Sequence, residues 1–321
     1  MRILLKSNHR YPADINCSSG LATRSDPSRA PAMLHDLLAE GLAELGHTVY
    51  YLLEDGQSKS PPIGVFPVSD EVPEVDICHN IESPKSPWVT TQHGFYGDAE
   101  PYPNQHTIFV SHALARAYGL DRMVWNGINP EHYVYTSEKS DYFLFLAAMQ
   151  GPSDKKKYHH KGLNVALGLC KKTGIRLIVA GTAIESAVVD QIDRMCIEAG
   201  AEYVGDVRGH EKAELLAGAQ GLLFPTQILE GFGLVMAEAL VSGTPVICSN
   251  RGACPELIPW DAGFVCDKEA DYIHALQHID TISPRRCREI AIERYHYRQM
   301  CAGYVREYER EIELHNSTNH G

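Results

Sequence analysis

One stretch of the sequence, residues 221–248, reads as a strand, a loop, a helix, a turn and a second strand. The first apolar run ends at Pro225, and a helix is expected from near Phe232 to Gly243, because Pro245 prevents its continuation. The apolar residues after Pro245 then predict a second buried strand. Strand, helix and strand in this order are typical of a parallel sheet with a right-handed crossover.

Two glycines lie where the loop of this unit becomes the helix. The start of a helix leaves backbone N–H groups unpaired and carries a partial positive charge, so Gly231-Phe232-Gly233-Leu234 suits a diphosphate. Glu230 lies in the loop, and Glu238 lies about two turns into the helix, roughly 10 Å further along its axis. The two carboxylates can accept hydroxyl hydrogen bonds on either side of the diphosphate, which fits a sugar on one side and a ribose on the other.

This stretch resembles the donor site of a known enzyme family. Glu230 and Glu238 are separated by seven residues and followed by Gly243-Thr-Pro-Val, as in the retaining glycosyltransferases of family 4. The resemblance continues upstream through Tyr203-Val-Gly-Asp-Val and downstream through Arg251-Gly-Ala-Cys-Pro-Glu. It implies an α/β chain of the GT-B fold class, with two doubly wound, Rossmann-like domains that face each other across a cleft.

The resemblance also implies roles for individual residues. Glu230 would contact the sugar hydroxyls, Lys161 the diphosphate, and His93, which follows an apolar run and precedes a glycine, the transferred sugar. Glu238 would hold the ribose. The expected catalytic residues are therefore His93, Glu230 and Lys161, and the expected donor-binding residues are Gly231, Phe232, Gly233, Leu234, Glu238 and Gly20. His79, which also follows a strand, is expected to have a structural role.

Bulk composition narrows the class of protein. A chain of 321 residues exceeds the usual size of one core, so two domains are expected. The net charge of −12 argues against a nucleic-acid partner, because neutralising phosphates needs a basic face. No apolar run reaches the roughly 18 residues of a membrane span, and the amino terminus turns polar too soon for a signal peptide. With nine cysteines scattered singly, a cytoplasmic protein with reduced thiols is expected.

Both halves of the chain alternate short apolar runs with amphipathic segments, so each half is expected to form a doubly wound sheet. The polar region from Glu131 to Asp141 suggests a boundary. We expect an N-terminal, acceptor-side domain over residues 1–137 and a C-terminal donor domain over residues 138–321. The last helix, about 297–313, is expected to cross back onto the first domain. Strands are predicted at residues 2–6, 49–53, 75–78, 88–91, 107–110, 123–125, 142–147 and 176–180, and helices at 31–45, 162–172 and 185–199.

The sequence departs from the family at two places. The family usually has Gly-Arg after the first strand of the donor domain, whereas this chain has Ala147-Ala148-Met149, with Ala148 in place of the arginine, and a longer loop with Lys155, Lys156 and Lys157. The arginine that would share the diphosphate charge is therefore absent. The amino-terminal loop has one candidate glycine, Gly20, where family members commonly have two.

Other site chemistries find little support. An Asp-x-Asp metal pair, a P-loop and an HExxH motif are all absent, so neither a metal nor a cofactor is expected, and adjacent His159 and His160 make a poor ligand pair. The predicted function is transfer of a hexose-type sugar from a nucleotide-diphosphate sugar to a hydroxyl of an unknown acceptor, which could be a glycan, a lipid-linked sugar or a small molecule. A sugar phosphorylase, a nucleotide-sugar epimerase and a non-catalytic nucleotide-sugar or glycan-binding protein remain alternatives.

Overall fold

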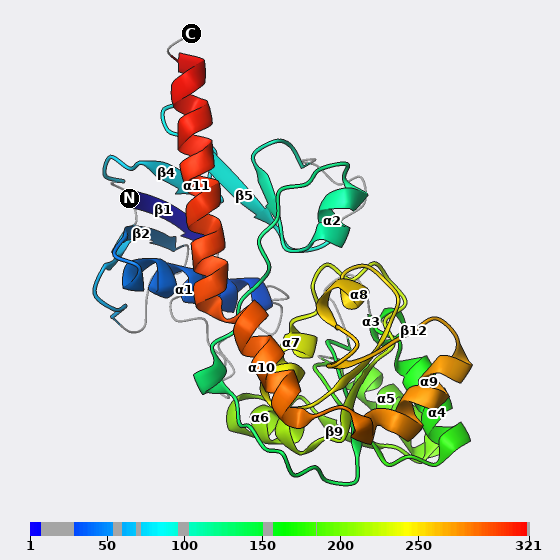
Figure 1. The fold of residues 1–321 in the computed structure, drawn as a ribbon. Coiled ribbons are helices and arrows are strands. Elements are labelled where there is room, and N and C mark those ends of the chain that lie inside the picture. Colours follow the sequence, from blue (N-terminus) through cyan, green and yellow to red (C-terminus); the bar gives the residue numbers. More distant parts are fainter. Residues whose placement is uncertain are drawn as a thin grey trace. The chain divides into compact units, whose positions relative to one another are not determined.

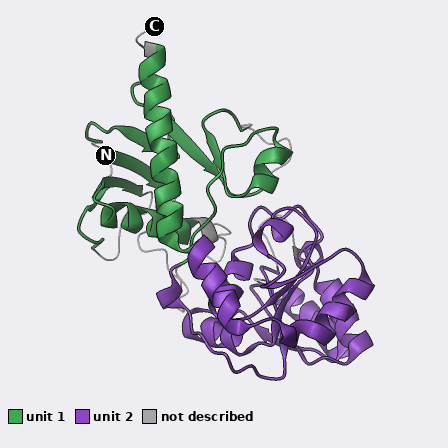
Figure 2. Ribbon diagram, viewed as in Figure 1, with its two compact units in different colours: residues 1–17, 28–128, 295–321 green, residues 18–27, 129–294 purple. Residues whose placement is uncertain are grey.

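The computed structural model describes residues 1–7, 29–53, 60–68, 72–95, 103–149, 157–183 and 185–319. These residues form two compact α/β units (Figure 2). Unit 1 contains the described residues up to Ile128 together with those from Tyr295 onward, and unit 2 contains Asn129 to Arg294. Each unit has its own six-stranded sheet, and every pairing between the named strands is parallel.

Unit 1 is built on a sheet with the strand order β3-β2-β1-β4-β5-β6 (Figure 1). The order reverses between β1 and β4, where ligands of doubly wound sheets commonly bind. Its elements are β1 (Arg2–Ser7), α1 (Arg29–Glu44), β2 (Thr48–Leu53), β3 (Val65–Val68), β4 (Ile77–His79), β5 (Trp88–Gln92), β6 (Thr107–Phe109), α2 (His112–Ala117) and α11 (Tyr297–Asn319).

Unit 2 repeats the plan with the strand order β12-β11-β10-β7-β8-β9. Its central strands are apolar on both faces because helices cover both sides of the sheet. Its elements are β7 (Phe143–Leu146), α3 (Lys157–His160), α4 (Leu163–Thr173), β8 (Leu177–Ala180), α5 (Ser186–Ala199), β9 (Glu202–Gly205), α6 (Gly209–Gly218), β10 (Gly221–Phe224), α7 (Leu234–Val241), β11 (Val246–Ser249), α8 (Cys254–Leu257), β12 (Gly263–Cys266) and α9 (Glu269–His278), with α10 (Pro284–Tyr295) leading towards α11.

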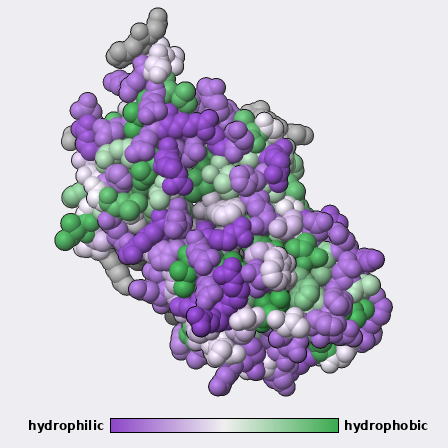
Figure 3. Space-filling model, viewed as in Figure 1, coloured by the Kyte–Doolittle hydropathy of each residue, from purple (hydrophilic) through white to green (hydrophobic). Residues whose placement is uncertain are grey.

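The terminal helix α11 packs along unit 1, beside α1 and β5 (Figure 1). Its buried side contributes Tyr304, whose hydroxyl lies 2.8 Å from that of Thr91, and Glu311, which pairs with the buried Arg122 at 2.7 Å. Hydrophilic side chains predominate on the face of this helix that Figure 3 shows. The helix therefore has one side in the core of unit 1 and another in solvent.

The sheets differ from the sequence prediction at one predicted strand and at three edge strands that were not predicted, β3, β9 and β12. Residues 123–125 form no strand, since Met123 makes only an isolated bridge to Phe109. The edge strand β3 was not predicted, because Pro67 interrupts its short apolar run and a proline is tolerated only where a ladder bond is dispensable. The units divide after Ile128, nine residues before the predicted boundary at 137, and the predicted donor and acceptor roles of the two domains stay predictions.

Candidate active site

The start of α7 has the conformation that an anion site needs. Gly233 is the N-cap of this helix and has a φ of 81°, in the left-handed region that favours glycine. A Cβ atom there would lie 2.7 Å from Cε of Met236 and 3.3 Å from Cγ of Glu230. No side chain caps the helix, and the N–H of Met236 donates back to the carbonyl oxygen of Gly233 at 2.9 Å, so the N–H groups of Leu234 and Val235 are the ones that face the helix end. The predicted start near Phe232 is two residues early.

Glu230 and Lys161, which are 69 residues apart in the sequence, form an ion pair beside this helix start. Nζ of Lys161 lies 2.6 Å from Oε2 of Glu230, and the two side chains are 16% and 12% exposed. Gly162 makes the approach possible: its φ is 87°, and a Cβ atom there would lie 1.9 Å from the carbonyl oxygen of Pro225. The start of α4 therefore lies directly against the loop that carries Glu230.

Glu238 is buried on α7 and has two partners within unit 2. Nζ of Lys212, on α6, lies 2.7 Å from its carboxylate, and the hydroxyl of Tyr133 donates to Oε1 at 2.9 Å. Burial, and then the charge of Glu238, raise the pKa of Tyr133 well above its usual value, so this hydroxyl keeps its proton and acts as a donor. Sequence analysis missed both partners, since Lys212 and Tyr133 stand in segments that look like an ordinary helix surface and a linker.

A second loop supports the backbone of Glu230. The N–H of Ala253 donates to the carbonyl oxygen of Glu230 at 2.9 Å. Gly252 has a φ of 57°, and a Cβ atom there would lie 2.3 Å from the oxygen and 2.4 Å from the nitrogen of Glu230. The loop between β11 and α8 thus fixes the position of Glu230, and it can do so only with glycine at 252.

His93 lies in unit 1, just after β5. Its Nε2 is buried and has no hydrogen-bond partner, and its ring lies 5.5 Å from that of His35. Burial lowers the pKa of His93 to about 4, so the imidazole is neutral near pH 7. A neutral, unsatisfied ring nitrogen suits a hydrogen bond to a hydroxyl or a backbone group of a ligand.

His79, by contrast, is satisfied within unit 1. Its Nδ1 lies 2.7 Å from the hydroxyl of Tyr308 and its Nε2 lies 2.7 Å from Oγ1 of Thr91. Burial lowers the pKa of His79 to about 3. Both ring nitrogens are engaged, which leaves none for a ligand and agrees with the structural role expected from the sequence.

The two lowered histidine pKa values predict a loss of stability in acid. Between the unfolded value of 6.5 and the folded values of about 4 and 3, the unfolded chain binds protons that the folded chain excludes, so stability falls as pH falls through this window. Each histidine contributes a slope of about 1.4 kcal/mol per pH unit. The free energy of unfolding, measured with urea between pH 7 and pH 5, is expected to fall more steeply for the native chain than for His93→Gln as the pH is lowered.

The exposed His210 provides the control for this comparison, because its side chain is 77% exposed. His210→Gln is expected to keep the native slope. Equal slopes for the native chain and His93→Gln would show that His93 titrates normally.

Several predicted site residues cannot be placed. Gly20, Lys155 and Lys156 lie outside the described residues, and of Lys157 only the backbone, which opens α3, is described. Ala148, where the family has arginine, is exposed just after β7. In the described ranges, no three His, Cys, Asp or Glu side chains gather as metal ligands would. The same part of the chain contains no helix long and apolar enough to cross a bilayer.

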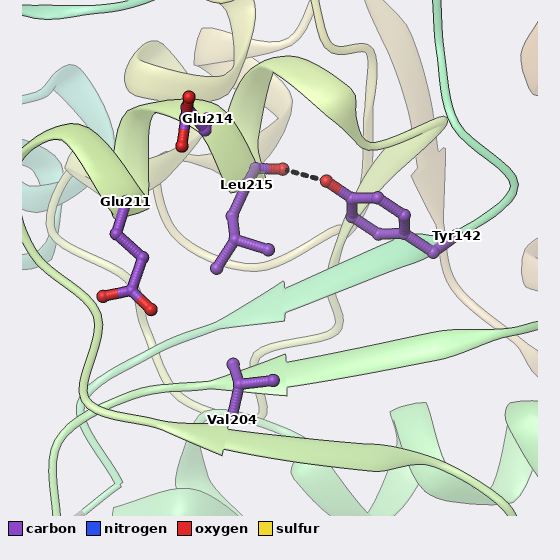
Figure 4. Close-up of a pocket in the computed structure, with 5 residues that line it drawn as sticks. All are labelled: Tyr142, Val204, Glu211, Glu214 and Leu215. Carbon is purple, nitrogen blue, oxygen red and sulfur yellow. Dashed lines mark hydrogen bonds between the residues drawn. The ribbon is translucent and has the colours of Figure 1, made fainter.

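A hollow of about 310 Å³ lies elsewhere on unit 2, between α6 and the sheet (Figure 4). It contains no predicted site residue, and the hydroxyl of Tyr142 donates across it to the carbonyl oxygen of Leu215 at 2.9 Å. The charged groups that line it are Glu211 and Glu214, which would repel a diphosphate. The helix start with its lysine is therefore the better donor site. The hollow is lined by Tyr142, Val204, Glu211, Glu214 and Leu215.

Comparison with known proteins shows what the sequence and the fold of this chain resemble. Residues 136–294 match the family model described as Glycosyl transferases group 1. A solved glycosyltransferase of avilamycin A biosynthesis, AviGT4, superposes with a TM-score of 0.73 and 22% identity over 97% of this chain and 98% of that one. Anabaena HepE, solved with UDP-glucose, superposes with a TM-score of 0.64 and 16% identity over 99% of this chain and 100% of that one.

The chain thus has the GT-B fold of these solved structures, and residues 136–294 are similar to the glycosyl transferases group 1. Among curated relatives, the O-antigen chain mannosyltransferase RfbU of Salmonella typhimurium is 24% identical over 193 residues, which are 56% of this chain and 52% of that protein. The chain spans about half, or less, of the length of the curated relatives it matches.

Proposed function

We propose that the protein is a retaining, metal-independent glycosyltransferase that moves a hexose-type sugar from a nucleotide-diphosphate sugar to an acceptor hydroxyl. The observation that carries the proposal is the arrangement around the start of α7, where the ion pair of Lys161 and Glu230 lies beside the uncapped N-terminus of the helix that also carries the buried Glu238. RfbU is a mannosyltransferase and HepE was solved with UDP-glucose, and both facts support a hexose donor. A cytoplasmic location stays a prediction.

In this proposal each site residue binds one part of the donor. Gly231 to Leu234 and Lys161 bind the diphosphate, Glu230 binds sugar hydroxyls, and Glu238 binds the ribose. His93, with its neutral ring, contacts the transferred sugar. Because Lys161 pairs with Glu230 in the ligand-free chain, the two side chains are held near the place where a sugar and its diphosphate meet.

The reaction needs no nucleophile from the protein. The bond between C1 of the sugar and the diphosphate oxygen breaks, a bond from C1 to the acceptor oxygen forms on the same face, and the acceptor proton passes to the leaving phosphate. Negative charge grows on the diphosphate as its bond to the sugar breaks. Lys161 and the start of α7 stabilise that charge, which is the main catalytic task of the site.

A screen of UDP-, GDP-, ADP- and dTDP-sugars tests the proposal. We expect the native chain to release the nucleoside diphosphate from one of these donors faster than the donor breaks down in buffer. We expect Glu230→Gln to abolish this release. Binding of a donor without any release would favour the alternative, a non-catalytic nucleotide-sugar-binding protein, which the missing arginine at position 148 makes worth testing. Absence of both binding and release for all four donors would contradict the proposal.

Turnover of the identified donor is expected to survive removal of divalent metals. The physical reason is that Lys161 and the N–H groups at the start of α7 supply the positive charge that a metal supplies in other transferases. Turnover should change less than about twofold in EDTA. A complete loss of turnover that magnesium or manganese restores would contradict this mechanism.

A further inference from the structure

The linker that leads from unit 1 into unit 2 is fastened to the helix that carries Glu238. Tyr133 donates a hydrogen bond to Glu238. The ring of Tyr135 packs on Gly243, where a Cβ atom would lie 2.8 Å from the ring. The same ring lies 5.0 Å from the guanidinium of Arg288. Nζ of Lys139 donates to the carbonyl oxygen of Ala217 at 2.7 Å and to Oγ1 of Thr244 at 2.9 Å. Only Tyr133 among these linker residues touches a predicted ligand-binding group.

Glu238 would be a poor ligand without its two partners. Its side chain is 8% exposed, and burying a carboxylate costs free energy unless a cation or hydrogen-bond donors lie beside it. Lys212 is that cation. A freely rotating carboxylate would not keep an oxygen turned towards a diol.

The carboxylate has capacity left for a ligand. Its two oxygens offer about four acceptor positions. Lys212 approaches both oxygens at 2.7 Å, and Tyr133 uses a further position on Oε1. At least one position therefore remains, on Oε2, for the hydroxyls of a ribose, and Tyr133 decides which oxygen is presented.

We propose that Tyr133 and Lys212 are positioning residues that hold the carboxylate of Glu238 oriented for the 2′- and 3′-hydroxyls of a ribonucleoside diphosphate. The proposal rests on the ribose role assigned to Glu238 above. If the proposal holds, Tyr133 makes the linker part of the donor site. Tyr133 and Lys212 would then favour nucleotides with a ribose over nucleotides whose sugar lacks these hydroxyls.

Paired probes isolate the effect of the hydroxyls. UDP, GDP and ADP, each with its 2′,3′-dideoxy analogue, are titrated calorimetrically into the native chain, Tyr133→Phe and Lys212→Met. The native chain is expected to bind the best of these ribonucleotides at least tenfold more tightly than its dideoxy analogue. Tyr133→Phe should reduce that ratio about fivefold, and Lys212→Met should reduce it more, while affinity for the dideoxy analogue stays the same.

A matched control comes from the same linker. Tyr135→Phe removes a hydroxyl but keeps the ring that packs on Gly243, and it should leave both affinities unchanged. Equal weakening of ribo and dideoxy forms in Tyr133→Phe would indicate a merely structural role and overturn the proposal, and so would unchanged ratios in both variants.

Glu238→Ala separates failure of this proposal from failure of the proposed function. If Glu238→Ala abolishes the preference for ribose while Tyr133→Phe and Lys212→Met keep it, the positioning role is wrong and the donor site stands. If Glu238→Ala also keeps the preference, or if none of UDP, GDP and ADP binds, the ribose role of Glu238 is wrong and the positioning proposal falls with it.

Discussion

Replacing Lys161 by alanine is expected to lower turnover about 100-fold, the size typical of removing one electrostatic stabiliser. Charge on the diphosphate grows as the glycosidic bond breaks, so the ammonium group stabilises the transition state more than the bound donor. Turnover should therefore fall more than donor affinity does. The variant also leaves Glu230, 12% exposed, without its ion-pair partner, which adds to the loss.

The matched control is Lys171→Ala, which removes an exposed lysine in the last turn of α4. It should keep native turnover. Steady-state kinetics with the identified donor measure both variants. If Lys161→Ala keeps full activity while replacement of Lys155, Lys156 and Lys157 by alanine abolishes it, the loop with these three lysines stabilises the diphosphate instead.

Ala148→Arg should leave turnover similar or raise it.

Gly252→Ala is expected to reduce turnover by about 100-fold although it alters no group that would touch the donor. The added Cβ would lie 2.3 and 2.4 Å from backbone atoms of Glu230, so Glu230 must move. A shift of about 1 Å in a positioned group can cost about 100-fold in rate. The left-handed φ of 57° adds about 1 kcal/mol of strain in the folded state.

Gly174→Ala is the control for that strain. Gly174 has a φ of 71°, and a Cβ there would meet no atom within 4 Å, so this variant carries the backbone cost alone. Its activity should match the native chain, with only a lowered unfolding midpoint. Equal kinetics in Gly252→Ala and Gly174→Ala would show that the loop after β11 does not position Glu230.

The sequence predicted most of the fold because parallel strands buried on both faces read as continuous apolar runs. The strands at residues 221–224 and 246–249, in which every residue is buried, are clear examples. The edge strand β3 was not predicted, because Pro67 interrupts its apolar run and is tolerated only at the edge of the sheet. The run at residues 123–125 was wrongly predicted to be a strand, since an apolar run of three residues does not by itself specify pairing.

The sequence predicted those parts of the candidate site whose residues stand close together along the chain. Glycines at a helix start and carboxylates beside it can be read in order along the chain. The pairing of Lys161 with Glu230, and of Glu238 with Lys212 and Tyr133, depends on which strand ends lie side by side. No spacing in the sequence encodes those pairs, because each joins segments that only the sheet order brings together.

The central claim, that Glu238 and the start of α7 form the donor site, is tested most directly by calorimetric titration of the cognate nucleoside diphosphate. The native chain should bind one equivalent. Glu238→Ala, confirmed to be folded by its unfolding midpoint, should bind about 10- to 100-fold more weakly, because a charged acceptor of ribose hydroxyls contributes roughly 1.5–3 kcal/mol. An unchanged Kd in Glu238→Ala would contradict the account.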